Sequence, residues 1–275
     1  MIYLITLIVA YCSIVYELLM AQTLSALMGN TIMRYSITIG IYLASLGLGA
    51  MLCEKGDEKD SAARLIRIEI WLSVIGGLAV FIICSLDVFH RFLLTSHSFF
   101  SYGLGDFIRP LLLFILSYSV IVLIGLLSGF EIPLLIQLSE ARKPNSMNIV
   151  LGIDYLGSLL GAVLFPLLLL PGLGLFATGY LTALLNAFAC ILLLIFKPAR
   201  GKFRSAKITA GVTAGLLFLL AFTENTQSFF LKKFYYYQNV KTFVKDNAGT
   251  DRNFVKISCP VNFMELSVCH VHECR

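Results

Sequence analysis

The chain consists largely of long apolar runs joined by short polar loops. A helix needs about 20 consecutive apolar residues to cross a bilayer, whereas barrel strands alternate polar and apolar residues in segments of about ten. These runs are continuous, so they predict helices. The composition agrees, with 58% hydrophobic and 13% charged residues among 275, against about 25% charged in soluble domains. We expect an all-α fold, a polytopic transmembrane helical bundle of about seven spans. The predicted spans are residues 2–27, 31–53, 66–86, 107–138, 149–170, 175–196 and 207–222.

The loops predict how this bundle is oriented and where it ends. Lys and Arg gather after the second, fourth and sixth spans, and the positive-inside rule then places the N-terminus in the cytoplasm. The same loops account for the net charge of +5, so nucleic acid is not expected as a partner. We predict a transmembrane domain over residues 1–222 and a short polar tail over residues 223–275. The fourth run is longer than one span needs, so it is tilted, or broken near Gly125, Gly129 and Pro133.

Four carboxylates interrupt the apolar runs: Glu17, Glu69, Glu131 and Asp154. A charge at membrane depth is costly, and such residues commonly mark binding sites or ion pathways. Glu69 lies near the start of its span, beside Arg67, and we expect it to reach the membrane interface. The other three acids are candidate ligands for a cation.

Hydroxylated residues share a helix face with each of these three acids. Residues three and four apart lie on one face of a helix, and small or hydroxylated side chains there indicate contact with another helix rather than with lipid. We therefore expect the first, fourth and fifth spans to pack together around a polar interior. The candidate ligand-binding residues are Ser13 with Glu17, Ser128 with Glu131, and Ser158 with Asp154.

Two interpretations of the acids stay open at this point. In the first, they bind a cation such as an amine. In the second, they are structural, and they pair with Arg34, with backbone donors or with one another. Burial disfavours a charged carboxylate, so one acid of a pair would then be protonated. The sequence favours neither interpretation over the other.

The end of the chain contains four residues of metal-ligand type, Cys269, His270, His272 and Cys274. Zinc sites usually combine two spaced pairs of ligands, and only Cys259 lies nearby. These four are weak metal candidates, an unstructured terminus is the favoured interpretation, and no metal is predicted. The chain contains no nucleophile elbow and no Gly-rich loop between a strand and a helix. No cofactor is therefore expected.

Three segments of the chain resemble a known family. They are YELLMAQTLSALMGNTIMRYSITIGIYLASLGLGA at residues 16–50, SGFEIPLLI at residues 128–136, and GIDYLGSLLGAVLFPLLLLPGLGL at residues 152–175. They are similar to the membrane-embedded N-terminal region of bacterial spermidine-synthase-like (polyamine aminopropyltransferase-like) proteins. The resemblance covers residues 1–222 and implies a multi-pass protein of the bacterial inner membrane. Glu17, Glu131 and Asp154 fall inside the similar segments, so they carry over as candidate polar-site residues.

In that family a soluble aminopropyltransferase domain with a Rossmann-like fold follows the membrane region. This chain has neither the Gly-rich adenosyl-binding loop nor the catalytic aspartates of that domain, and only residues 229–240 resemble its beginning. We therefore expect a truncated member or a stand-alone membrane module, without aminopropyl transfer of its own.

The predicted role is an anchor, or a module that binds a polyamine or another cation through the buried carboxylates. A transporter for small cations or polyamines is one alternative. Another is a spermidine-synthase-like enzyme that works with a soluble catalytic partner in trans. A third is a remnant whose acids only tie helices together. The expected partners are the lipid bilayer, a polyamine or other cation, and that soluble partner.

Overall fold

The computed structural model describes residues 1–28, 31–54, 58–95, 105–196 and 202–230, and this part of the chain is helical without strands. The prediction of an all-α fold is therefore confirmed. The candidate metal ligands Cys269, His270, His272 and Cys274 lie outside the described residues, as do residues 231–240. The elements are α1 (Ile2–Met28), α2 (Thr31–Met51), α3 (Glu58–Thr95), α4 (Gly105–Gly129), α5 (Glu131–Glu140), α6 (Met147–Leu164), a π-helical turn (Phe165–Leu169), α7 (Leu170–Phe196) and α8 (Lys202–Ala221).

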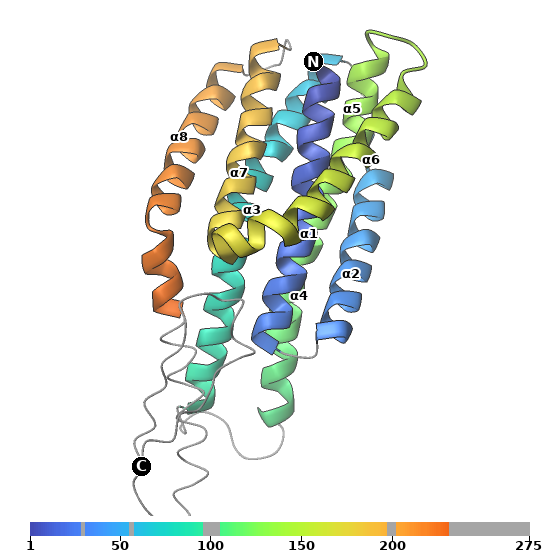
Figure 1. Ribbon diagram of the computed structural model, residues 1–275. Helices are drawn as coiled ribbons and strands as arrows, with labels where there is room; N and C mark the ends of the chain where they lie inside the picture. Colours follow the sequence, from blue (N-terminus) through green and yellow to red (C-terminus); the bar gives the residue numbers. More distant parts are fainter. Residues whose placement is uncertain (29–30, 55–57, 96–104, 197–201, 231–275) are drawn as a thin grey trace, which may run out of the picture.

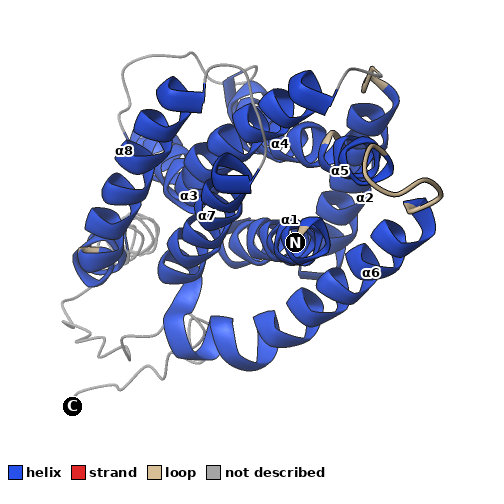
Figure 2. Cartoon of the chain, turned by 90° about the horizontal axis from the view of Figure 1, so that it is seen from above, coloured by secondary structure: helices blue, strands red, loops and turns tan. Residues whose placement is uncertain are grey.

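Helix α1 runs through the middle of the bundle, as the view along its axis shows (Figure 2). It packs most extensively against α6 and α7, and it also contacts α2 and α3. Its sequence is apolar on every side, which is the pattern of a helix surrounded by other helices. Helix α8 lies at the edge of the bundle beside α7 and α3 (Figure 1). The polar residues of α1 are therefore enclosed by neighbouring helices.

Two helix contacts depend on glycines that let backbones approach closely. A Cβ atom on Gly157 of α6 would lie 2.5 Å from the Leu7 carbonyl oxygen of α1, and one on Gly161 would meet Ile14. In the same way, Gly49 of α2 and Gly129 of α4 face each other without room for a side chain. Small residues of α2, α4 and α6 therefore act as close packing positions between helices.

The chain is interrupted within the fourth apolar run, for which the sequence left a tilt or a break open, and it bends between the fifth and sixth predicted spans. Helix α4 ends at Gly129 and α5 begins at Glu131, so the long fourth run breaks at Phe130. Between α6 and α7 the chain passes through the π-helical turn and then bends at Gly174, where φ is +74°. Glycine adopts this backbone conformation readily because it has no Cβ atom. The bend turns α7 back along the bundle, where it packs against α3 and α1 (Figure 1).

Five helical stretches of the described chain are long and apolar enough to cross a membrane. One of them, Met147–Ile195, contains two predicted spans, α6 and α7. A sixth qualifies when Ser205–Ala221 and Thr223–Phe230, which are bent by 61°, count together. The start of α3, the loop between α5 and α6, and the start of α8 lie at the same end as the N-terminus (Figure 1). Membrane insertion, the number of spans and the domain boundary at residue 222 stay predictions.

Candidate functional site

Glu17 lies on α1 among buried residues of the bundle. Its side chain is 5% exposed, and the neighbouring Tyr16 is 1% exposed. The Tyr16 ring rests on Gly76 of α3, where a Cβ atom would lie 2.5 Å from the ring. The Tyr16 hydroxyl has no hydrogen-bond partner. This part of α1 therefore places one carboxyl group and one unbonded hydroxyl in the interior.

Tyr42 of α2 connects two of the predicted serines. Its hydroxyl lies 2.9 Å from the Ser13 hydroxyl, and it donates a hydrogen bond of 3.1 Å to the Ser13 carbonyl oxygen. It also lies beside the Ser128 hydroxyl, which is buried and makes no hydrogen bond of good geometry. Glu17 and Glu131 both interact electrostatically with Tyr42. The sequence analysis missed this tyrosine, although a phenol within an apolar span is itself a signal.

Glu131 is buried at the first residue of α5, with 3% of its surface exposed. Phe130, the residue before it, keeps helical φ and ψ angles, and its N–H donates to the Leu127 carbonyl oxygen at 3.2 Å. The interruption between α4 and α5 is therefore a single tightened turn. Pro133 has no N–H to donate to the preceding turn, which is consistent with an interruption at this point.

Glu69 contradicts the prediction that it reaches the membrane interface. Its side chain is fully buried, and neither carboxyl oxygen has a hydrogen-bond partner. The sequence analysis counted its distance from the end of the predicted apolar run. However, α3 begins at Glu58, so Glu69 lies about three turns inside the helix. Its electrostatic neighbours include Glu131, Cys12 and Cys190.

Asn186 of α7 is a second buried polar residue that the sequence analysis missed. It is fully buried, and both atoms of its amide lack partners. Thr182 and Cys190 lie one turn away on either side, and the Thr182 carbonyl oxygen accepts a hydrogen bond of 3.6 Å from the Cys12 thiol. Cys12 and Cys190 both lie near Glu69. Asn186 therefore lies on the side of α7 that faces Glu69. An amide in the middle of an apolar span would have been the signal.

Asp154 is half-buried on α6, and so is Ser158 one turn later. The glycine contacts at Gly157 and Gly161 hold this face of α6 against α1. Asp154 and Glu131 interact electrostatically. The first, fourth and fifth predicted spans therefore do pack together, and the fourth span contributes to this contact mainly through α5.

The described residues give these acids no basic partner. Arg34, one of the alternative partners that the sequence left open, lies elsewhere among the described residues: its guanidinium carbon is 5.8 Å from the centre of the Phe114 ring, and its Nε atom has no partner. No group of three His, Cys, Asp or Glu side chains in the described part of the chain lies close enough to hold a metal ion. The arrangement is thus a set of acids spread over four helices, with unbonded hydroxyl and amide groups among them.

Comparison with known proteins gives several relatives that are named polyamine aminopropyltransferase. A polyamine aminopropyltransferase of Leptospira interrogans is 35% identical over 187 residues, which are 67% of this chain and 33% of that protein. One from Oceanobacillus iheyensis is 30% identical over 238 residues, which are 83% of this chain and 42% of that protein. The chain is a homologue of proteins named polyamine aminopropyltransferase. It spans about a third to two fifths of their length.

These relatives confirm the resemblance to spermidine-synthase-like proteins. A polyamine aminopropyltransferase of Ralstonia nicotianae adds a match of 33% identity over 182 residues. No family model and no solved structure matches the chain. That the matched part is a membrane domain in these relatives stays a prediction.

Proposed function

We propose that this chain is a membrane-embedded, multi-pass helical module of a polyamine aminopropyltransferase-like protein, and that its buried carboxylates bind a polyamine or a similar organic cation. Three observations support the proposal. The helices are long and apolar enough to cross a membrane. The relatives are named for polyamine chemistry. Glu69, Glu131 and Asp154 have no Lys or Arg partner among the residues that the structure describes.

The arrangement around Glu131 carries the proposal. Glu131 interacts electrostatically with Glu69 and with Asp154, and all three lack Lys or Arg partners among the described residues. Uncompensated buried charges are strongly destabilising, by several kcal/mol each. A bound cation would remove that cost. Because no three of these groups converge on one point, an extended cation with separated amino groups fits them better than a single metal ion.

The proposed location is the bacterial inner membrane with the N-terminus in the cytoplasm. The start of α3, the loop between α5 and α6, and the start of α8 lie at one end of the bundle together with the N-terminus (Figure 1), and Lys and Arg are frequent in the sequence around these segments. The positive-inside rule places such loops in the cytoplasm. Adding a cysteine to one of these loops and labelling it from outside intact cells tests this orientation. Labelling without permeabilisation would contradict it.

The binding proposal is tested by thermal stability of the purified protein with spermidine, putrescine or NaCl at matched ionic strength. A ligand that binds only the folded state stabilises it by about 2.7 kcal/mol at 100 times its Kd. We expect the polyamines to raise the melting temperature, and Glu131→Gln and Asp154→Asn to remove the effect. Glu140→Gln is the matched control, because Glu140 ends the same helix as Glu131 but is exposed.

Two results would contradict the binding proposal. One is a folded protein whose melting temperature does not respond to polyamines. The other is an effect that Glu140→Gln removes as completely as Glu131→Gln. Uptake of labelled spermidine into proteoliposomes would show in addition that the module transports its ligand.

A further inference from the structure

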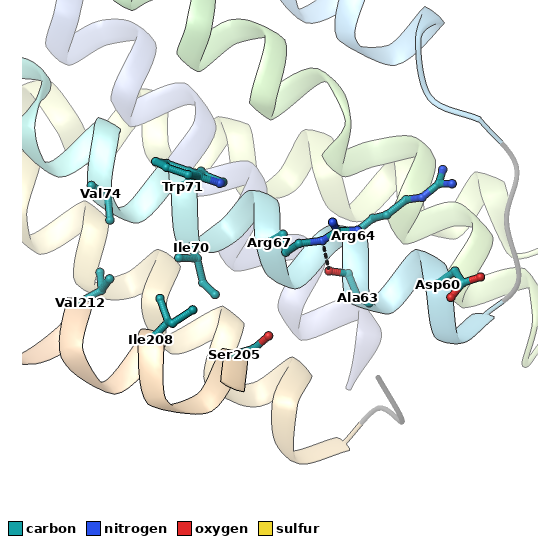
Figure 3. A pocket seen from close by; sticks show the side chains of 10 residues that line it. All are labelled: Asp60, Ala63, Arg64, Arg67, Ile70, Trp71, Val74, Ser205, Ile208 and Val212. Atoms are coloured by element: carbon teal, nitrogen blue, oxygen red, sulfur yellow. Dashed lines mark hydrogen bonds between the residues drawn. The ribbon is translucent and has the colours of Figure 1, made fainter. Parts of the chain in front are cut away.

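An open groove runs between α3 and α8, away from the acidic interior. Its volume is about 770 Å³. Arg64 and Arg67 line one part of it, and Ile70, Trp71 and Val74 continue the same row along α3 (Figure 3). Apolar residues of α8 face them across the groove. Along the axis of α3, the groove therefore passes from a basic part at Arg64 and Arg67 to an apolar part at Ile70, Trp71 and Val74.

A second groove lies on the other side of the same α3 row. Its volume is about 340 Å³, and Arg64, Arg67 and Trp71 line it as well. Its other wall includes Leu127 and Phe130, where α4 passes into α5. Two largely apolar grooves thus share one pair of arginines and one tryptophan.

The two arginines keep their positive charge available. The Arg67 Nε atom donates to the Ala63 carbonyl oxygen at 3.3 Å, and an Arg64 Nη atom donates to the Glu54 carbonyl oxygen at 3.4 Å. Neutral carbonyl groups leave the guanidinium charges uncompensated. Asp60 also lines the larger groove, at the outer end of the row beyond Arg64 (Figure 3), and Glu54 lines the smaller one. Each acid lines a single groove, whereas both arginines line both grooves, so positive charge is concentrated in the part that the two grooves share.

We propose that the two grooves together bind one anionic phospholipid. Its phosphate lies between Arg64 and Arg67, and one acyl chain follows each groove on either side of Trp71. The proposal rests on the membrane location proposed above, and it is independent of the acidic site. The predicted orientation supports it, since anionic lipids of the cytoplasmic leaflet attract basic residues and basic pockets between helices bind their head groups. Long basic side chains also reach readily from an apolar surface to the interface.

Trp71 makes the proposal directly measurable, because it is the only tryptophan of the chain. The protein is reconstituted into phosphatidylcholine vesicles that contain a small fraction of brominated phosphatidylglycerol or, separately, of brominated phosphatidylcholine. Bromine quenches tryptophan fluorescence at short range. We expect stronger quenching by the anionic lipid at equal mole fraction. Each basic residue near a membrane contributes about fivefold in affinity, so Arg64→Gln with Arg67→Gln should weaken the preference at least fivefold.

Two further variants separate this site from general charge attraction. Arg142→Gln with Lys143→Gln removes the same charge from an exposed loop at the same end of the bundle, and it should reduce the preference much less than the variant of Arg64 and Arg67. An equal reduction by both variants would overturn the lipid site. Arg64→Lys with Arg67→Lys keeps the charge and should retain most of the preference, which guards against a misfolded glutamine variant. Excess inorganic phosphate should also leave the preference for the anionic lipid unchanged. If inorganic phosphate displaced that lipid, the phospholipid assignment would be overturned.

The remaining outcomes distinguish the two proposals. Equal quenching by both brominated lipids would overturn the lipid site while leaving the membrane location intact. Absence of quenching in a protein that floats with the vesicles would mean that another segment or a partner covers the grooves, and this also overturns the lipid site. A protein that does not float with the vesicles would contradict the membrane location itself.

Discussion

The contact between α6 and α1 differs sharply from the contact between α8 and α3, although glycines occur in both regions. On α6, a Cβ atom at Gly157 or Gly161 would collide with α1. On α8, Gly211 and Gly215 are exposed, and a Cβ atom there would meet nothing within 4 Å. The contact of α8 with α3 is made instead by a side chain, because a Cβ atom on Gly77 of α3 would lie 2.8 Å from Leu216 of α8. The first contact thus brings two backbones together, whereas the second leaves a groove of about 770 Å³ beside it.

The comparison shows that the role of a glycine depends on whether another helix packs against it. Close backbone approach holds the half-buried acid of α6 next to the buried acids of the interior. The groove beside α8 leaves part of the surface of α3 and α8 accessible to other molecules. The buried carboxylates and the proposed lipid site therefore belong to regions that are packed in different ways. Four substitutions test this comparison.

Replacing both close-packed glycines should have the largest effect. In Gly157→Ala with Gly161→Ala, new methyl groups would press on the Leu7 carbonyl oxygen at 2.5 Å and the Tyr11 carbonyl oxygen at 2.9 Å. Overpacking costs typically about 1–3 kcal/mol per site. We expect a large fall in the melting temperature of the purified protein. An unchanged melting temperature would mean that α6 does not approach α1 this closely.

Glu69→Leu should increase the stability of the ligand-free protein. Neither Glu69 oxygen has a partner, and a buried polar group without a hydrogen bond costs about 1–3 kcal/mol in proteins. Leucine has a similar size and no such cost, so the free energy of unfolding in denaturant should rise by that amount. The same variant should lose its stabilisation by spermidine. A fall in stability would indicate that Glu69 has a partner in the native protein.

Tyr42→Phe should weaken the contact between α1 and α2 moderately. It removes the hydroxyl that lies 2.9 Å from the Ser13 hydroxyl and keeps the ring. The net contribution of a hydrogen bond is about 0.5–1.5 kcal/mol, so the loss of stability should be of that size. Tyr155→Phe is a suitable control because Tyr155 is 71% exposed. An equal effect of both substitutions would contradict a specific role for the Tyr42 hydroxyl.

Gly211→Ala should have the smallest effect and the opposite sign from the α6 variant. The position is exposed and has room for a methyl group. Alanine reduces the freedom of the unfolded chain, which stabilises a helix by about 0.4–1 kcal/mol. A small rise in melting temperature is therefore expected. A clear fall would mean that another segment covers α8, and it would remove the contrast with α6.

Some features of the fold were predictable from the sequence because they depend on local chemistry. Continuous apolar runs predicted helices, and the length of the fourth run with Gly125, Gly129 and Pro133 indicated a tilt or a break there. The close contact of Gly157 and Gly161 with α1 depends on which helix faces them. The depth of Glu69 was not predictable in this way, because the polar start of α3 hides how far the helix extends. Tyr42 and Asn186 were also missed, since their importance depends on which helices face them.

By itself, the sequence determined an all-helical chain, rich in apolar residues, with acids at positions where acids are rare. Hydrophobicity and backbone preferences act within a few residues, so these properties can be read along the chain. Only the tertiary structure decided which acids meet. Glu69 and Glu131 are more than 60 positions apart in the sequence, and they become neighbours because α3 and α5 pack side by side. The positions of Arg34 over Phe114 and of Arg64 and Arg67 beside two grooves depend on packing for the same reason.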